Sequence, residues 1–399
     1  MKIHKLAIDG GNPVRSSFLQ YGKQSISEND IRSVENTLRS NFLTSGPAVE
    51  EFEGKISEYC DSEYSVSLSS GTTALHALYK SIGLEEDDEV IIPSITFAST
   101  ATSVLFCGAR PVFTEIDPET LLIDTKDIDR KISSRTKLIV GVDYAGQMAD
   151  YEEINNIRNL HNEKIYIFAD AAHSFGALQS NNKSGNVADA TTFSFHPVKG
   201  ITTAEGGAVS TNDLNIYKKI KKIRNHGISL DFNKRDDNLT WEYDIDELGF
   251  NYRLSDLHAS LGLSQIQSIG EKIDRRKKIA DKYDLAIDDI EGLSSLRTIE
   301  KNKHAHHIYV VKIDLERFTV DRSIIFRALR AENIGVNVHY IPLYNLKVFS
   351  HLGYNKSNFP VTNDTYERIL TLPIWPDMLE SDIQSVVDAL IKVLSFYRK

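Results

Sequence analysis

Short apolar runs alternate with amphipathic stretches between about residues 65 and 211. Runs such as 138–142 are apolar at nearly every position, which is typical of strands that helices cover on both faces. The pattern predicts strands at 64–68, 89–92, 110–115, 138–142, 165–169, 191–195 and 208–211. Helical patterns lie between them, including 98–106 and 150–160. This alternation predicts an α/β domain with a mostly parallel sheet.

The pattern changes after residue 211. Longer amphipathic stretches predict helices at 215–223, 254–266 and 272–286, followed by a strand at 307–313, a helix at 323–332, a strand at 335–339 and a last helix from Ser381. A chain of 399 residues is also too long for one compact core. We therefore expect a large α/β domain over residues 1–250 and a smaller α+β domain over residues 251–399.

Composition narrows the classes of partner. The formal net charge is −10, with both signs interspersed, which argues against nucleic acid or an anionic membrane as a partner. Cys60 and Cys107 lack the spacing of a zinc site or a disulfide framework, so no metal is expected. The start of the chain has no apolar leader and no apolar run could span a bilayer, so we expect a cytoplasmic protein.

Three polar groups follow predicted strands, where α/β sheets bind their ligands. The turn Ser69-Ser70-Gly71-Thr72-Thr73 joins a strand to a helix start, whose free amides suit a phosphate. The alternative is an ordinary helix cap. Asp170 ends another strand, and His173 follows three residues later. A carboxylate there needs a cation, and a protonated pyridine nitrogen would be one; the alternative is again a cap.

Lys199 supplies the third group. It follows a predicted strand, between Pro197 and Gly200, and a desolvated amine in such a loop can attack a carbonyl. Most lysines are solvated surface groups, and that alternative stands for Lys199 taken alone. A phosphate turn, an anchoring acid and a nucleophilic amine at one sheet edge are what pyridoxal 5'-phosphate (PLP) requires.

These motifs resemble a known family. The chain is similar, over nearly its whole length, to the PLP-dependent sugar aminotransferases of fold type I, the DegT/DnrJ/EryC1/StrS family. The longest matching segment runs from Phe193-Ser-Phe-His-Pro-Val-Lys199 through Gly200-Ile-Thr-Thr-Ala-Glu-Gly-Gly-Ala-Val. Shorter matches are Leu43-Thr-Ser-Gly-Pro47, Ser70-Gly-Thr72, Pro93-Ser-Ile-Thr-Phe97, Asp170-Ala-Ala-His173, Asn251-Tyr-Arg253 and Val338-His-Tyr-Ile-Pro342.

The resemblance implies a role for each cofactor residue. Lys199 would hold PLP as a Schiff base, Asp170 would contact the pyridinium nitrogen, Phe97 would stack on the ring and His173 would lie beside it. The phosphate would be held by Ser70, Gly71, Thr72 and Ser194. Asn251 would reach the phosphate of a neighbouring subunit, which implies a homodimer with shared active sites. The alternatives are a core aromatic for Phe97, a locally satisfied histidine for His173 and a helix cap for Asn251.

The resemblance also suggests how the substrates bind. A nucleotide-sugar cleft would be lined by Tyr21, Asn41, Phe42, Leu43, Thr44, His339, Tyr340, Ile341 and Pro342. His339 and Tyr340 could equally be strand-end residues of the smaller domain. Gly200 and Tyr344 depart from the family pattern, and we expect both near the sugar.

One branch of the family is the most similar. Val142-Asp-Tyr-Ala-Gly-Gln147 and Glu247-Leu-Gly-Phe-Asn251 resemble the pseudaminic-acid branch, which aminates C4 of a UDP-linked 4-keto-6-deoxy-N-acetyl sugar. The amino donor would be L-glutamate. Other readings are a 3- or 4-aminotransferase for dTDP- or GDP-linked sugars, a PLP-dependent sugar dehydratase, and a non-catalytic PLP-binding regulator. Dehydratases of this family replace the lysine with histidine, and no DNA-binding segment is visible for a regulator.

Overall fold

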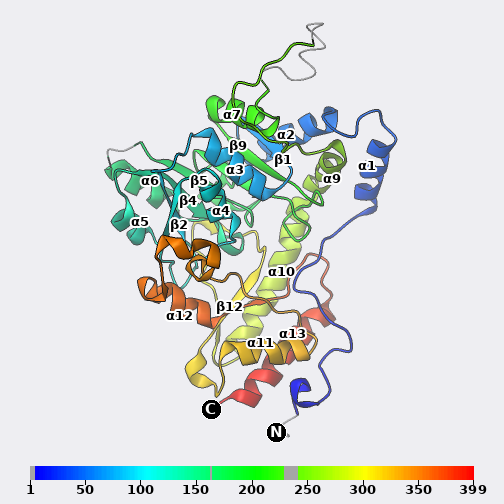
Figure 1. The fold of residues 1–399 in the computed structure, drawn as a ribbon. Helices are drawn as coiled ribbons and strands as arrows, with labels where there is room; N and C mark the ends of the chain where they lie inside the picture. Colours follow the sequence, from blue (N-terminus) through cyan, green and yellow to red (C-terminus); the bar gives the residue numbers. More distant parts are fainter. Residues whose placement is uncertain (1–4, 162–163, 229–240) are drawn as a thin grey trace.

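The fold was analysed in a computed structural model that describes residues 5–161, 164–228 and 241–399. A seven-stranded sheet occupies one end of the molecule, and a long helix leads from it to a second group of helices and strands (Figure 1). In order across the sheet, the strands are β1 (Tyr64–Leu68), β9 (Gly207–Thr211), β8 (Ala190–Ser194), β5 (Tyr166–Asp170), β4 (Thr136–Val142), β2 (Glu89–Pro93) and β3 (Arg110–Thr114).

The sheet is mostly parallel, as predicted. Strands β3, β2, β4, β5 and β8 pair in parallel, and β9 runs antiparallel between β8 and β1. All seven predicted strands are confirmed, with their ends within two residues of the predicted positions. The carboxyl ends of β1, β5 and β8 therefore lie at one edge, where Ser69, Asp170 and Phe195 follow or end their strands.

Both faces of the sheet are covered by helices, and this explains the continuous apolar runs. Val90 and Ile92 pack on one face with α3 (Gly71–Ser81), α4 (Ser99–Phe106) and α7 (Leu214–Arg224). Ile91, between them, packs on the other face with α5 (Thr125–Lys131) and α6 (Tyr151–Leu160). Successive strand side chains point to opposite faces, so a strand buried on both sides has to be apolar throughout.

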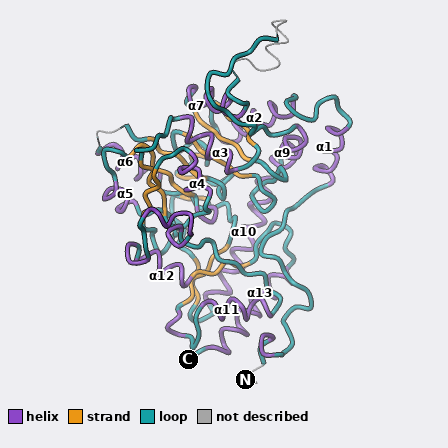
Figure 2. Tube along the Cα trace, in the orientation of Figure 1, coloured by secondary structure: helices purple, strands orange, loops and turns teal. Residues whose placement is uncertain are grey.

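Three further helices extend one side of the sheet region. Helix α9 (Asp256–Ile266) packs against both α1 (Glu28–Leu38) and α2 (Pro47–Cys60). The sequence pattern predicted α9 but neither α1 nor α2. Helix α10 (Ile269–Asp288) then runs away from the sheet (Figures 1 and 2). None of the helices in the described ranges combines the length and apolarity needed to span a bilayer.

The C-terminal part is built on a three-stranded antiparallel sheet of β10 (Leu293–Ser295), β12 (Tyr309–Ile313) and β13 (Ile369–Leu372). Helices α10, α11 (Arg322–Ala331) and α13 (Glu380–Tyr397) share its apolar core. Leu6 and Leu19 belong to the same core, so the N-terminal segment packs on the C-terminal part. A short helix, α12 (Pro360–Arg368), leads into β13.

The predicted strand at 335–339 is wrong. Only isolated bridges join this segment to its neighbours, Leu19 with Ile334 and Asn337 with Thr371. His339 and Tyr340 are therefore not strand-end residues. The segment continues instead to Leu343, whose N–H donates to the Ser94 carbonyl (2.8 Å) just beyond β2.

Candidate active site

Lys199 lies in the loop that connects the antiparallel strands β8 and β9. Pairing of Ser194 with Gly207 fixes the base of this loop, and the Lys199 N–H donates to the His196 carbonyl (2.9 Å). Burial lowers the pKa of the Lys199 amine to about 8; the Arg276 guanidinium lowers it further, whereas the Asp170 carboxylate opposes both. About a tenth of an amine with this pKa is neutral at pH 7, far more than for an ordinary lysine, which suits a nucleophile.

Asp170 ends β5 and is only 6% exposed. Its carboxylate accepts hydrogen bonds from the Thr100 hydroxyl (2.7 Å) and the Ala172 N–H (3.3 Å). Burial raises the pKa of Asp170, an effect that these bonds and the Lys199 charge oppose. No Lys, Arg or His of the described residues forms an ion pair with it. A buried carboxylate without a cation is costly, so its surroundings suit a cationic ring nitrogen.

The predicted phosphate turn brings Gly71 against Ser194. A Cβ atom at position 71 would lie 2.9 Å from the Ser194 Cβ and 3.2 Å from its Oγ, so glycine allows α3 to begin beside the end of β8. The Ser70 hydroxyl accepts from the Thr73 N–H (3.1 Å), which makes Ser70 the cap of α3. Thr72 follows in the first turn, where helix N–H groups lack partners within the helix and can bind a phosphate.

Tyr340 lies with His173 and Phe97. The Tyr340 hydroxyl is 3.0 Å from His173 Nε2, and its ring centroid is 5.9 Å from that of Phe97. His173 also packs on His307, with centroids 4.3 Å apart, and burial holds the pKa of His173 well below its ordinary value. Phe97 is 58% exposed, which excludes the core-aromatic alternative and leaves its ring free to cover a planar ligand.

The other residues of the 339–342 segment lie around this group. His339 is buried, with its Nδ1 2.9 Å from the Thr371 hydroxyl, and the Tyr21 ring lies 5.5 Å from its ring. Ile341 is exposed and Pro342 is buried. Tyr21, His339 and Tyr340 are thus brought together as predicted, but Tyr340 also contacts the residues expected to hold the cofactor.

The structure places the 41–44 segment elsewhere. Asn41, Phe42, Leu43 and Thr44 are exposed, and the Leu43 carbonyl accepts from the Asp256 N–H (3.1 Å) at the start of α9. No hydrogen bond or ring contact within the described ranges joins them to the Lys199 site. Asn251 is also exposed, and it does not cap α9, because the Ser255 hydroxyl accepts from the His258 N–H (3.4 Å) in that role.

The two departures from the family pattern differ in position. Tyr344 is buried in the core, stacked on Phe359 with centroids 4.7 Å apart, and its position relative to the sugar stays a prediction. Gly200 lines a small cavity beside Lys199. A Cβ there would be 3.5 Å from Ile269 and 3.6 Å from the Phe175 carbonyl, so a larger residue also fits.

Sequence reasoning missed several side chains of this site. Thr100 hydrogen-bonds Asp170, and Arg276 and Lys272, both on α10, line the cavity beside Lys199. Only Thr100 had a local signal, because it follows the matched Pro93–Phe97 segment and comes just after β2. The α10 residues come from a distant amphipathic helix whose pattern alone does not reveal which face meets the sheet.

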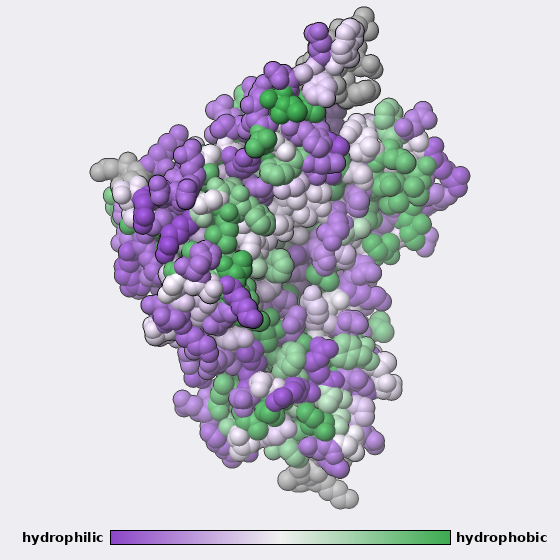
Figure 3. All heavy atoms as spheres, in the orientation of Figure 1, coloured by the Kyte–Doolittle hydropathy of each residue, from purple (hydrophilic) through white to green (hydrophobic). Residues whose placement is uncertain are grey.

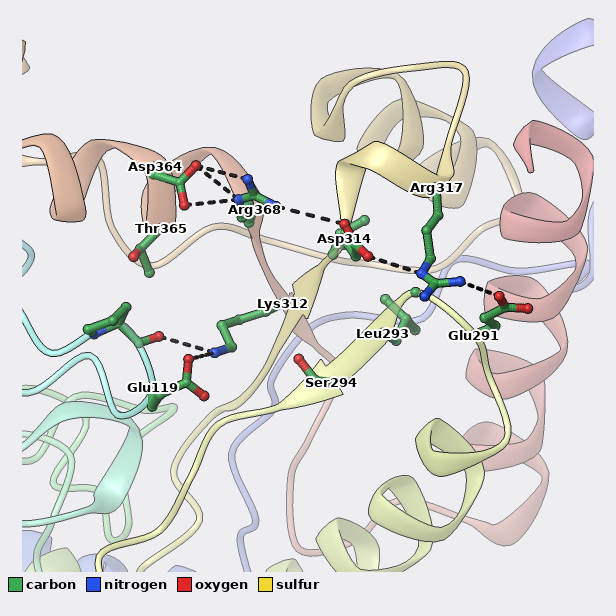
Figure 4. A pocket seen from close by; sticks show the side chains of 13 residues that line it. Glu119, Glu291, Leu293, Ser294, Lys312, Asp314, Arg317, Asp364, Thr365 and Arg368 are labelled. Carbon is green, nitrogen blue, oxygen red and sulfur yellow. Dashed lines mark hydrogen bonds and ion pairs between the residues drawn. The ribbon is translucent and has the colours of Figure 1, made fainter. Parts of the chain in front are cut away.

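A larger hollow of about 450 Å³ lies in the C-terminal part, away from Lys199 (Figure 4). Its cations are paired with acids: Lys312 with Glu119 (2.6 Å), Arg317 with Asp314 (3.0 Å) and Arg368 with Asp364 (3.0 Å). No unpaired Lys or Arg among its described lining residues is available to a charged ligand.

Proteins with assigned functions are similar to this chain over nearly its whole length. The sequence profile of the DegT/DnrJ/EryC1/StrS aminotransferase family matches residues 24–391. The chain is 34% identical to the UDP-4-amino-4,6-dideoxy-N-acetyl-beta-L-altrosamine transaminase of Campylobacter jejuni, over 96% of this chain and 99% of that protein. It is also 34% identical to the spore coat polysaccharide biosynthesis protein SpsC of Bacillus subtilis, over 94% and 97%.

Solved structures are similar over the same span. PseC of Helicobacter pylori, an aminotransferase involved in pseudoaminic acid biosynthesis, superposes with a TM-score of 0.88 at 30% identity, covering 95% of this chain and all of that one. A Streptococcus pneumoniae protein assigned as a sugar aminotransferase, in its PMP form, has a TM-score of 0.89 at 29% identity, covering 94% and 99%. Its PLP form gives a TM-score of 0.87. The chain therefore belongs to the DegT/DnrJ/EryC1/StrS aminotransferase family, and it is a PLP-dependent sugar aminotransferase.

Proposed function

We propose that the protein transfers the amino group of L-glutamate to the 4-keto group of a UDP-linked 4-keto-6-deoxy-N-acetylhexosamine. The observation that carries the amino-transfer chemistry is the buried Asp170 carboxylate, which forms no ion pair among the described residues and hydrogen-bonds only neutral groups at the end of β5, in the same sheet whose β8–β9 loop holds Lys199. The sugar is inferred from the Campylobacter jejuni and Helicobacter pylori relatives, whose names refer to this pathway.

The residue roles belong to the same proposal. Lys199 would hold PLP covalently, and Asp170 would keep the ring nitrogen protonated. Phe97 and His173 would lie against the ring, while the phosphate would be bound by Ser70, Gly71, Thr72 and Ser194. When bound, PLP supplies an electron sink that stabilises negative charge on the donor's α-carbon.

The chain's own groups would then position substrates and move protons. With PLP bound, the Lys199 amine would serve as the general base toward the α-carbon of the donor, and it would return a proton at C4 of the sugar. The Tyr340 hydroxyl and His173 would hold the ring in place from one side. Tyr21, His339 and Ile341 would line the approach of the sugar, together with Pro342.

A homodimer with shared active sites completes the proposal. Asn251 and the segment Asn41, Phe42, Leu43 and Thr44 are exposed, so they could serve a neighbouring subunit. Apolar residues gather on this side of the molecule (Figure 3), where Ile31, Leu38, Phe42 and Leu43 are exposed. A contiguous apolar surface of this kind marks an interface. We also propose a cytoplasmic location, since Cys60 and Cys107 are both free thiols.

The direct test incubates the PLP-loaded protein with glutamate and a panel of UDP-, dTDP- and GDP-linked keto sugars, followed by mass spectrometry and NMR of the product. Amination at C4 of the UDP sugar is expected. Amination at C3, or of a dTDP or GDP sugar, would select another aminotransferase reading. Elimination of a hydroxyl from the sugar would indicate a dehydratase. PLP binding without turnover of any sugar would indicate a regulator.

A Lys199→Ala variant tests the central residue. It is expected to abolish turnover and the absorbance of lysine-bound cofactor, because the amine proposed to hold PLP is removed. The matched control is Lys183→Ala, which removes a half-buried lysine that pairs with Asp61 (3.0 Å). Appreciable turnover by PLP-loaded Lys199→Ala would refute the assignment.

A further inference from the structure

A small cavity with an unusual charge lies beside Lys199. It has a volume of about 10 Å³ and is enclosed by the lysine loop, helix α10 and the segment before α1. Its lining includes four cationic side chains, Lys23, Lys199, Lys272 and Arg276, and the described residues that line it include no Asp or Glu. A polar site of this size holds about one water-sized atom.

Arg276 is the innermost of these cations. It is 2% exposed, and its guanidinium donates to main-chain carbonyls, those of His307 (3.0 Å) and, more weakly, Val198 (3.4 Å). Its Nε has no hydrogen-bond partner in the described part of the chain, and no carboxylate there forms an ion pair with it. Burial lowers the pKa of Arg276 to about 10. The His307 Nδ1 also lies 3.4 Å from the guanidinium, but none of these partners is negatively charged, so Arg276 lacks the counter-charge that buried guanidinium groups ordinarily have.

Lys272, one helical turn before Arg276, is also buried. Its ammonium donates to the Gln265 side-chain carbonyl, and the Gln265 amide donates in turn to Asp30 (2.7 Å). Lys272 is therefore linked to the Asp30 carboxylate only through the Gln265 side chain, and Asp30 lies outside the cavity lining. Residues four apart on a helix share a face, so Lys272 and Arg276 present two positive charges to the same space.

We propose that this cavity, through Arg276 and Lys272, binds a carboxylate of the amino donor. This inference rests on the proposed function. The donor's amino group reacts at Lys199, which lines the cavity, so its carboxylates come within a few bonds of these cations. A carboxylate oxygen matches the space, whereas a nucleotide diphosphate is too large for it. Guanidinium and ammonium groups recognise carboxylates through charge-assisted hydrogen bonds.

The test measures binding of glutarate, a dicarboxylate without an amine, to the PLP-loaded enzyme by calorimetry, with UDP as the second probe. Arg276→Met is expected to weaken glutarate binding by about 10-fold or more, since one charge-assisted bond contributes roughly that much, and to leave UDP binding unchanged. Arg275→Met is the matched control, because the neighbouring Arg275 is exposed and pairs with Asp377 (2.9 Å). Weakened UDP binding with unchanged glutarate binding, or no glutarate binding by the wild type, would overturn the proposal.

Arg276 also holds the Val198 carbonyl, so its loss could disturb the lysine loop. Lys272→Met makes the same test without that bond, and PLP content reports whether the loop is intact. Comparing L-alanine with L-glutamate as donors distinguishes the two donor carboxylates. If the variants react more slowly with both donors, the cavity binds the α-carboxylate. If they react more slowly with glutamate alone, the cavity binds the side-chain carboxylate.

The outcomes separate this inference from the proposed function. If glutamate leaves the cofactor absorbance of the wild type unchanged while glutarate binding still depends on Arg276, the proposed donor is wrong and the carboxylate site stands. If glutamate bleaches the wild type and both variants bind glutarate as the wild type does, the site is wrong and the proposed function stands.

Discussion

At the scale of single residues, the site depends on charges that are buried without full compensation. Lys199 and Asp170 favour each other's charged form, while burial opposes both. The sequence allowed these two residues to be predicted because each lies next to a strand end. It could not reveal that Tyr340 meets His173 across 167 positions, or that Arg276 turns toward Lys199, because those contacts depend on tertiary packing.

The titration of Lys199 leads to a pH prediction. The neutral amine is the nucleophile, so the rate at which the PLP-free protein recaptures PLP should rise with pH and level off above about 8, where the Lys199 pKa lies. Asp170→Asn removes the charge that raises this pKa, so its plateau should begin at a lower pH. Stopped-flow absorbance measures both; a wild-type rate still rising above pH 10 would contradict the prediction.

Tyr340→Phe tests the contact with His173. The Nδ1 of His173 already has no partner among the described residues, so losing the hydroxyl leaves both ring nitrogens unpaired. An unsatisfied buried polar group costs about 1–3 kcal/mol. The free energy of unfolding in urea should fall by about that amount. Tyr166→Phe is the control, since no hydrogen bond of its hydroxyl is found within the described ranges; equal effects would contradict the prediction.

At the scale of elements, the predicted strands were accurate because burial on both faces produces apolar runs with sharp ends. The segment 335–339 alternates Val336 and Val338 with polar residues, as a strand would, but it meets β13 only through the single bridge of Asn337 with Thr371, so no ladder forms. Helices α1 and α2 carry mixed polar faces and were not predicted. The local hydrophobic pattern predicts which residues are buried, but it does not predict which strands pair with one another.

Gly71→Ala tests the contact between α3 and β8. The added methyl group would meet the Ser194 Cβ at 2.9 Å, so the helix start must move away and its N–H groups with it. The Kd for PLP, measured by fluorescence titration, should rise by about 10-fold or more, equivalent to one lost phosphate contact.

The control for this variant is Gly54→Ala in the middle of α2, where a Cβ meets nothing within 4 Å. That change should stabilise the protein by about 0.5–1 kcal/mol and leave PLP affinity unchanged, because alanine favours a helix over glycine. Wild-type PLP affinity in Gly71→Ala would show that the phosphate is bound elsewhere.

At the scale of the whole molecule, the expected substrate residues fall into two separate groups. Tyr21, His339 and Tyr340 lie by Lys199, while Asn41 to Thr44 lie at the start of α9. The family resemblance predicted both groups as one cleft, and no contact between the two groups is found among the described residues. A second copy of the chain would resolve this separation if the exposed α9 side of one subunit met the cleft of the other.

A double variant tests this arrangement. Phe42→Asp with Leu43→Asp places two charges on the exposed apolar surface, and a dimer interface there should be lost because it would bury them unpaired. Light scattering after size-exclusion chromatography should report a monomer with weakened PLP binding. Leu160→Asp, at an exposed leucine of α6, is the control. A double variant that stays dimeric with full PLP affinity would contradict the shared site.

The position of β9 in the sheet has a consequence for how the chain is made. Among the described strands, β1 pairs only with β9, which is synthesised about 140 residues later, so the turn at Ser69–Gly71 cannot meet Ser194 until the ribosome has passed that point. Tyr340 and Arg276 emerge later still. A nascent chain arrested before residue 207 would carry Asp170 and Lys199 without a place for the cofactor's phosphate. PLP added during translation should therefore be captured only by chains that have nearly been completed.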